Sequence, residues 1–195
     1  MSLEGGSDDP VSLTNYLLAA IATLPTFHED VGAQYVARKH AQAQVIAQAI
    51  SDVAESTEGW SGTKRELATL LLTVAWHETH FSLRIHEGNC KPFECDHGRA
   101  RSLWQLHVHP SLPRETWLGL AGVDVDATRR AAREAAKALA RSRNMCASRA
   151  RGVELVAQTL SAYAGRGCAR LLPDIDARVR TYRRLILIQP KGTSA

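Results

Sequence analysis

A single glutamate, Glu78, stands where an apolar stretch of sequence gives way to a polar one. Residues 67–76 read LATLLLTVAW, and residues 79–101 are rich in Cys, His and Gly. Burial at the end of an apolar helix disfavours the charged form of a carboxyl group, so this side chain could stay protonated near neutral pH. A protonated carboxyl can protonate a leaving group, as glycosidic bond cleavage requires. The alternative is an ordinary glutamate on the solvated face of a helix end.

Two segments further along the chain favour the chemical interpretation. Residues 98–106 read GRARSLWQL, and residues 160–165 read LSAYAG. Together with residues 75–81, AWHETHF, and in this order, they resemble the lysozyme-like superfamily, specifically the soluble lytic transglycosylases and goose-type lysozymes. The resemblance covers about residues 65–170, and it implies an α-rich, lysozyme-like single domain.

The resemblance assigns roles to individual residues. Glu78 matches the catalytic acid, and Thr79 stands where the family usually has Ser. Gln105 is implied to contact substrate through its amide, and Tyr163 to contact substrate or orient the acid. Ser102 replaces a family Gly, so the backbone there must avoid a positive φ or accept strain. The family Asn is absent, because Ala and Gly directly follow Tyr163.

The resemblance also implies the reaction, which is cleavage of the β-1,4 bond between N-acetylmuramic acid and N-acetylglucosamine in peptidoglycan, without a cofactor or metal. A hydrolase of this type usually uses a second carboxylate. Lytic transglycosylases are understood to manage with one Glu, because the sugar's own hydroxyl closes a 1,6-anhydro ring. Glu87, Glu94 and Asp96 are candidates for the second carboxylate, and we favour Asp96, which leads into the turn at Gln105. The alternative for Asp96 is a turn-capping role. Trp104 offers a flat face for a sugar ring, or it belongs to the core.

Two other functions remain open. His77 and His80 do not complete a metal motif, since the metalloprotease helix places its two His four residues apart and these are three apart. With His107 and His109 they could still make a zinc hydrolase. The second alternative is a non-catalytic domain that binds glycan or nucleic acid, although no helix-turn-helix or zinc-finger pattern is present.

The overall charge is moderately basic. The chain of 195 residues has a formal net charge of +4, and the stretch 129–151 is especially basic. We expect this stretch to attract anionic polymers of the cell envelope, or to be a solvated Arg-rich helix. No apolar run reaches the roughly 18 residues that a membrane span needs.

The chain contains four cysteines, which allow two disulfides. Cys90 and Cys95 flank a short turn that a disulfide could close. Cys146 and Cys168 lie at the ends of two neighbouring helices and could link them. Disulfides predict an oxidising, extracytoplasmic compartment, although no signal peptide is visible.

Helical periodicity dominates the chain, and we expect one mainly α-helical domain over residues 11–188. Residues 1–10 are interpreted as a leader or tag, and residues 189–195 as a tail. The long loop 82–101 leaves room for a small irregular hairpin. The expected helices lie near 11–24, 32–55, 126–143, 151–163 and 174–187, and another starts at Thr63 and carries Glu78. Thr63 followed by Glu66 is a capping-box pattern, and Asp126 or Thr128 can cap the helix that runs to about Arg143. Short helices or turns are expected near 102–108 and 116–118.

Overall fold

The computed structural model of the chain describes residues 10–25, 33–168 and 173–189. It is mainly helical, as the sequence predicts. The elements in chain order are α1 (Pro10–Ala22), α2 (Ala33–Ser56), α3 (Lys64–Thr79), α4 (Leu83–His86), α5 (Cys95–Gly98), β1 (Ala100–Arg101), β2 (Leu106–His107), α6 (Arg114–Leu118), α7 (Val125–Cys146), α8 (Gly152–Tyr163) and α9 (Pro173–Ile186).

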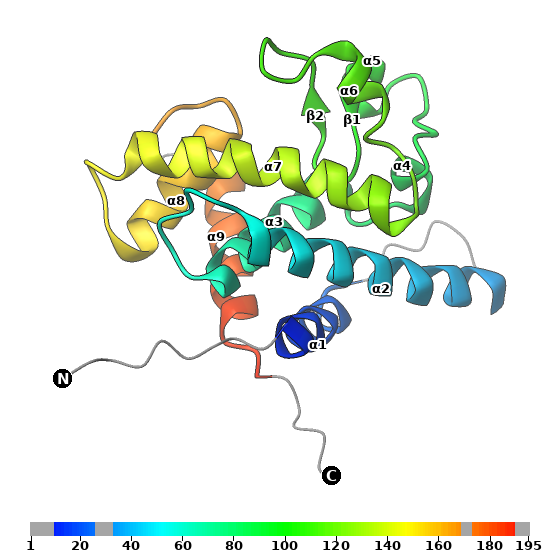
Figure 1. Cartoon of the computed structure of the whole chain (residues 1–195), viewed down its shortest axis with the longest axis horizontal. Coiled ribbons are helices and arrows are strands. Elements are labelled where there is room, and N and C mark those ends of the chain that lie inside the picture. Colours follow the sequence, from blue (N-terminus) through cyan, green and yellow to red (C-terminus); the bar gives the residue numbers. More distant parts are fainter. Residues whose placement is uncertain (1–9, 26–32, 169–172, 190–195) are drawn as a thin grey trace.

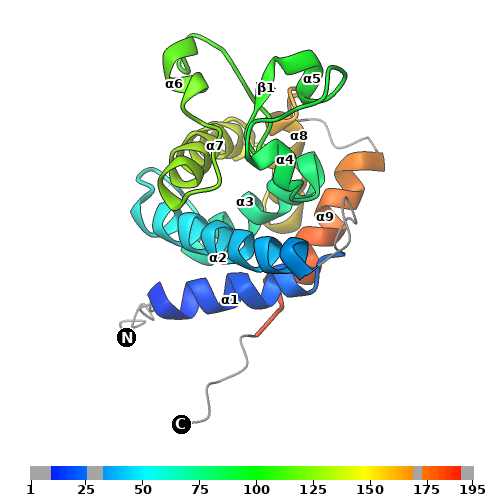
Figure 2. The same ribbon diagram turned by 90° about the vertical axis from the view of Figure 1, so that its right-hand side faces the viewer.

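Helix α3 is the centre of the molecule. Its residues 67–76 are all buried, as expected for a helix that is apolar on every side. It contacts α1, α2, α7 and α9, and Figure 2 shows it in the middle of the surrounding helices. The helix that ends near Glu78 is therefore the most enclosed element of the fold.

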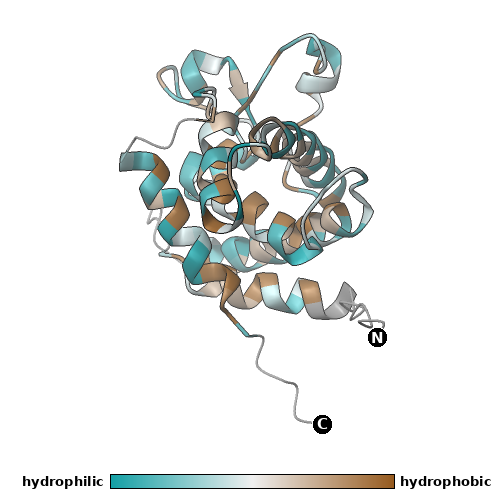
Figure 3. Cartoon of the chain, turned by 90° about the vertical axis from the view of Figure 1, so that its left-hand side faces the viewer, coloured by the Kyte–Doolittle hydropathy of each residue, from teal (hydrophilic) through white to brown (hydrophobic). Residues whose placement is uncertain are grey.

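The outer helices bury one face each. Helix α2 packs against α1 and α7, and α7 packs against α8. The buried face of α7 consists largely of alanines, whose small side chains let the helices approach closely. Helix α9, the last described helix, carries both hydrophilic and hydrophobic positions (Figure 3), and its apolar face packs against α3 and α8.

The segment between α3 and α7 forms a separate small region. Figure 1 places α5, α6 and the two strands together beyond α7. The strands β1 and β2 are antiparallel, with Ala100 opposite His107 and Arg101 opposite Leu106. A small hairpin is thus present, but only its first strand lies within 82–101. The turn of this hairpin is the segment 102–105 that the sequence singled out.

The helix starts follow local capping chemistry. Thr63 caps α3, and its side chain accepts a hydrogen bond from the backbone N–H of Glu66, which confirms the capping pattern expected from the sequence. The expected cap of α7 was Asp126 or Thr128, and this was wrong. Asp124 caps the helix and accepts from the N–H of Ala127 at 2.8 Å, so α7 begins earlier than predicted.

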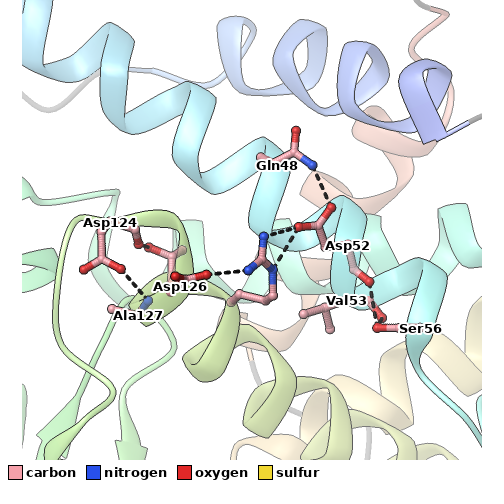
Figure 4. Close-up of polar contacts among 9 residues, drawn as sticks. Gln48, Asp52, Val53, Ser56, Asp124, Asp126 and Ala127 are labelled. Atoms are coloured by element: carbon pink, nitrogen blue, oxygen red, sulfur yellow. Dashed lines mark hydrogen bonds and ion pairs between the residues drawn. The ribbon is translucent and has the colours of Figure 1, made fainter.

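The basic stretch 129–151 is partly neutralised within the fold. Arg129 donates to Asp52 of α2 at 2.8 Å and to Asp126 at 2.6 Å, in the contacts drawn in Figure 4. Arg143 is buried and donates to Glu66 at 2.8 Å. These two arginines therefore hold α7 against α2 and α3. The helices among the described residues include none long and apolar enough to cross a membrane.

Both expected disulfides are confirmed. Cys90–Cys95 closes the loop before α5, and Cys146–Cys168 joins the end of α7 to the segment after α8. The described residues include no free cysteine.

Removing the Cys146–Cys168 disulfide, by changing both residues to Ser, is expected to lower the free energy of unfolding by about 3 kcal/mol. The same change at Cys90 and Cys95 is expected to cost about 2 kcal/mol, because a shorter loop constrains the unfolded chain less. The sequence separations are 22 and 5 residues, respectively. Urea titrations of the two double variants measure both effects, and equal losses, or four free thiols in the native protein, would contradict this account.

Candidate functional site

A cleft of about 480 Å³ brings the three sequence segments together. It lies among the end of α3, the small region around the hairpin, the end of α8 and the start of α9. Five of the seven predicted catalytic and substrate-contacting residues line it, while Thr79 and Ser102 do not. The lining residues are Glu78, Asp96, Ala100, Trp104, Gln105, His107, Tyr163, Ala164, Gly165, Arg166, Asp174 and Arg178.

Glu78 reaches the cleft from the last turn of α3. The side chain is 22% exposed and forms an ion pair with Arg178 of α9, whose Nη1 donates to Oε1 at 2.6 Å. The sequence indicated burial of this side chain but no ion partner for it, so the contact with Arg178 is a feature of the site that could not be foreseen from residues 67–81.

Hydrogen bonds fix the three segments to one another. The hydroxyl of Tyr163 donates to the backbone oxygen of Trp104 at 2.9 Å. The indole N–H of Trp104 donates to the backbone oxygen of Leu71 in α3, also at 2.9 Å. The hydroxyl of Thr79 donates to Ala75 at 3.0 Å and lies 3.5 Å from the backbone oxygen of Leu103. These hydrogen bonds therefore fix the relative positions of α8, the hairpin turn and α3 around the cleft.

These contacts determine which parts of Trp104 and Tyr163 a ligand could reach. Trp104 is only 1% exposed, so its ring is part of the core beneath the cleft and presents no open face to a sugar. Tyr163 is half-buried. Burial and the nearby charge of Glu78 raise the pKa of its phenol, so the hydroxyl stays protonated and remains a donor to Trp104.

Ser102 in the hairpin turn has the strained backbone conformation, a positive φ, that was one of its two expected options. Its φ is 68°, and that of Gln105 is 48°, both in the left-handed region. Ser102 is buried, and its Oγ accepts from the N–H of Trp104 at 3.3 Å. The amide of Gln105 donates to the backbone oxygen of Ser102 at 3.0 Å, which holds the Gln105 side chain against the turn at the edge of the cleft.

Ser102→Gly is expected to stabilise the protein by up to about 1 kcal/mol, because glycine adopts a positive φ without the steric cost that serine carries. The long hydrogen bond to Trp104 is lost, which offsets part of the gain. Urea titration measures the change. A less stable Ser102→Gly variant would mean that this hydrogen bond outweighs the backbone strain.

Asp96 lies in an unusual backbone conformation. Cys95, Asp96, His97 and Gly98 have φ values of 50°, 50°, 57° and 77°, so α5 is a single left-handed turn. Left-handed turns are costly for residues other than glycine, and such strain gathers at functional sites. The side chain of Asp96 accepts from Arg99 at 3.2 Å and lies 3.9 Å from Nδ1 of His107. Asp96 therefore reaches the cleft as an exposed carboxylate beside basic groups.

The histidines near Glu78 have separate structural contacts. Nε2 of His77 lies 2.9 Å from the hydroxyl of Thr181, and burial lowers the pKa of His77 to about 4. The His80 ring meets Trp76 edge to face. No three His, Cys, Asp or Glu side chains among the described residues are grouped to hold a metal ion. The zinc alternative, with His107 and His109 joining His77 and His80, therefore has no ligand set in this part of the chain.

His86 lies outside the cleft and links three helices. Its Nδ1 is 3.2 Å from the amide nitrogen of Gln42 in α2, and its Nε2 is 2.8 Å from the hydroxyl of Thr128 in α7. Thr128 donates its own proton to the backbone oxygen of Asp124, so Nε2 of His86 must be the donor and Nδ1 the acceptor. Burial lowers the pKa of His86 to about 4, which fits this neutral, fully paired ring.

Four charged or titratable residues of the cleft were not assigned a role in glycan cleavage from the sequence: His107, Arg166, Asp174 and Arg178. Arg166 and Asp174 form an exposed ion pair of 3.1 Å. Arg178 could have been found, because it falls on the apolar stripe of α9 formed by Ile175, Val179, Tyr182 and Leu185, and it is buried with them. An arginine at such a position needs a buried partner.

Comparisons with known proteins returned no significant similarity to a protein-family model, a curated protein or a solved structure.

Proposed function

We propose that this protein is a glycosidase that cleaves the β-1,4 bond between N-acetylmuramic acid and N-acetylglucosamine in peptidoglycan, with Glu78 as general acid and base. The observation that carries the proposal is that one cleft contains Glu78, Gln105 and Tyr163, each from a separate segment of the chain. These are the three positions that the lysozyme-like resemblance assigns to the acid and its substrate contacts.

The proposed reaction begins with a proton transfer. Glu78 gives its proton to the glycosidic oxygen, the bond to the leaving sugar breaks, and Glu78 becomes a carboxylate. It then takes a proton from the attacking hydroxyl group. In a transglycosylase that hydroxyl belongs to the sugar itself and a 1,6-anhydro ring closes. In a lysozyme the attacking group is a water molecule, and we assign Asp96 to assist it. Asp174, the other aspartate that lines the cleft, is paired with Arg166.

The surroundings of Glu78 suit this role. Helix α3 is buried along residues 67–76, so the catalytic carboxyl stands on a rigid element. Tyr163 and Gln105 are fixed by hydrogen bonds to the hairpin turn. The two disulfides suit a protein that acts in an oxidising compartment outside the cytoplasm.

Digestion of purified peptidoglycan, followed by mass spectrometry of the released fragments, tests the proposal. Fragments with 1,6-anhydromuramic ends would establish a transglycosylase, and Asp96→Asn should then keep most of its activity. Fragments with reducing ends would establish a lysozyme, and Asp96→Asn should then lose activity by about a hundredfold or more. Release of no fragments by the wild-type protein would contradict the proposal.

A further inference from the structure

Among the described residues that line the cleft, Arg178 is the one that is both charged and deeply buried. It is 9% exposed, and it lines the cleft together with Glu78 and Tyr163. Removing a guanidinium from water is costly unless acceptors replace the water. The hydrogen bonds of Arg178 therefore indicate which kind of chemical group binds in the cleft.

The pairing of Arg178 is incomplete. Nη1 donates to Oε1 of Glu78 at 2.6 Å, but the buried Nε has no hydrogen-bond acceptor among the described residues. Arginine and a carboxylate pair most strongly through two parallel N–H···O bonds. Glu78 uses one, so the guanidinium keeps capacity for a second carboxylate.

We propose that Arg178 recognises a carboxylate of the substrate and exchanges Glu78 for it, which makes the cleft selective for anionic glycans. This inference rests on the function proposed above and names the group of the substrate that is recognised. The carboxylate is that of the lactyl group of N-acetylmuramic acid or one carried by its stem peptide. Neutral glycans of N-acetylglucosamine lack both groups.

The exchange also frees the catalytic carboxyl group. Nη1 of Arg178 lies 2.6 Å from Oε1 of Glu78, so this oxygen is occupied while the pair is intact. When the guanidinium donates to the substrate's carboxylate instead, Oε1 of Glu78 is released. Because the side chain of Glu78 is partly exposed in the cleft, the released oxygen can face the glycosidic oxygen of the bound substrate.

Titrations followed by NMR test the inference with probes that contain no glycosidic bond. The probes are N-acetylglucosamine, N-acetylmuramic acid, and N-acetylmuramic acid joined to the dipeptide L-alanyl-D-isoglutamine. We expect the wild-type protein to prefer an anionic probe over N-acetylglucosamine. Preference for N-acetylmuramic acid assigns the lactyl carboxylate, and preference for the dipeptide form assigns the peptide. Equal binding of all three probes would overturn the inference.

Variants identify the residue responsible. Glu78→Gln removes the competing carboxylate and should bind the preferred anionic probe about tenfold more tightly, whereas Arg178→Gln and Arg178→Lys should lose most of the preference. Arg180→Gln makes the same charge change at an exposed position of α9 and should keep the preference. Retained preference in Arg178→Gln, or no tightening in Glu78→Gln, would overturn the inference. The Glu78→Gln measurement still decides if Arg178→Gln fails to fold, as judged by circular dichroism.

The two proposals can fail separately. Binding of an anionic probe through Arg178 without fragment release from peptidoglycan would contradict the glycosidase function and support the anion site. Fragment release with no role for Arg178 in probe binding would contradict the anion site alone.

Discussion

Glu78→Gln is expected to lower the rate of peptidoglycan cleavage about a thousandfold, because positioned general acid–base catalysis contributes roughly 10²–10⁴ to rate. The amide has nearly the shape of the carboxyl group but cannot deliver the proton. The rate can be followed by the loss of turbidity of a peptidoglycan suspension. Cosedimentation with peptidoglycan should persist, because the contacts of Gln105 and Tyr163 remain.

Two controls make this result specific to the cleft. Glu58→Gln changes an exposed glutamate between α2 and α3 and should cleave at the wild-type rate. Circular dichroism should show that Glu78→Gln keeps its helix content, since its effect is expected on chemistry and not on folding. Cleavage by Glu78→Gln at more than a tenth of the wild-type rate would remove this residue from the mechanism.

The second large effect is an expected decrease in the free energy of unfolding in acid. The pKa of His86 is about 4 in the folded protein, against an ordinary value of 6.5. The unfolded chain therefore binds a proton between these pH values and the folded protein does not. The stabilisation is complete above pH 6.5 and is lost as the pH falls toward 4, by about 3 kcal/mol. Burial of the ring, together with the nearby positive charge of Lys39, disfavours the protonated form.

Urea titrations at pH 7 and pH 4.5 measure this loss, and His86→Gln is the comparison. The variant lacks the titrating group, so its stability should change less between the two pH values, whatever its stability at pH 7. His77, whose pKa is also lowered to about 4, acts in the same direction in both proteins and cancels from the comparison. An equal loss in wild type and variant would show that His86 does not control the acid response.

Features governed by local sequence could be predicted well. The apolar run before Glu78 predicted the buried helix α3, and Thr63 with Glu66 predicted its start. The cysteine pairs followed from their places relative to turns and helix ends. Each of these features depends on residues close together in the chain or on the spacing of apolar residues along one helix. The structure confirms them.

Features governed by tertiary contacts were not predictable to the same degree. The left-handed turn at Asp96 depends on the closed loop before it, because no run of residues other than glycine favours that conformation by itself. The burial of Trp104 depends on an acceptor in α3. The pair between Glu78 and Arg178 joins residues 100 positions apart, and only the place of Arg178 on an apolar stripe hinted at it.

The most direct test of the central claim is to treat purified peptidoglycan with equal amounts of wild-type and Glu78→Gln protein and to identify the released fragments by mass spectrometry. We predict glycan fragments that end at N-acetylmuramic acid, with either anhydro or reducing ends, from the wild-type protein only. The same fragments from Glu78→Gln, or none from the wild-type protein, would contradict the claim that Glu78 cleaves the glycan in this cleft.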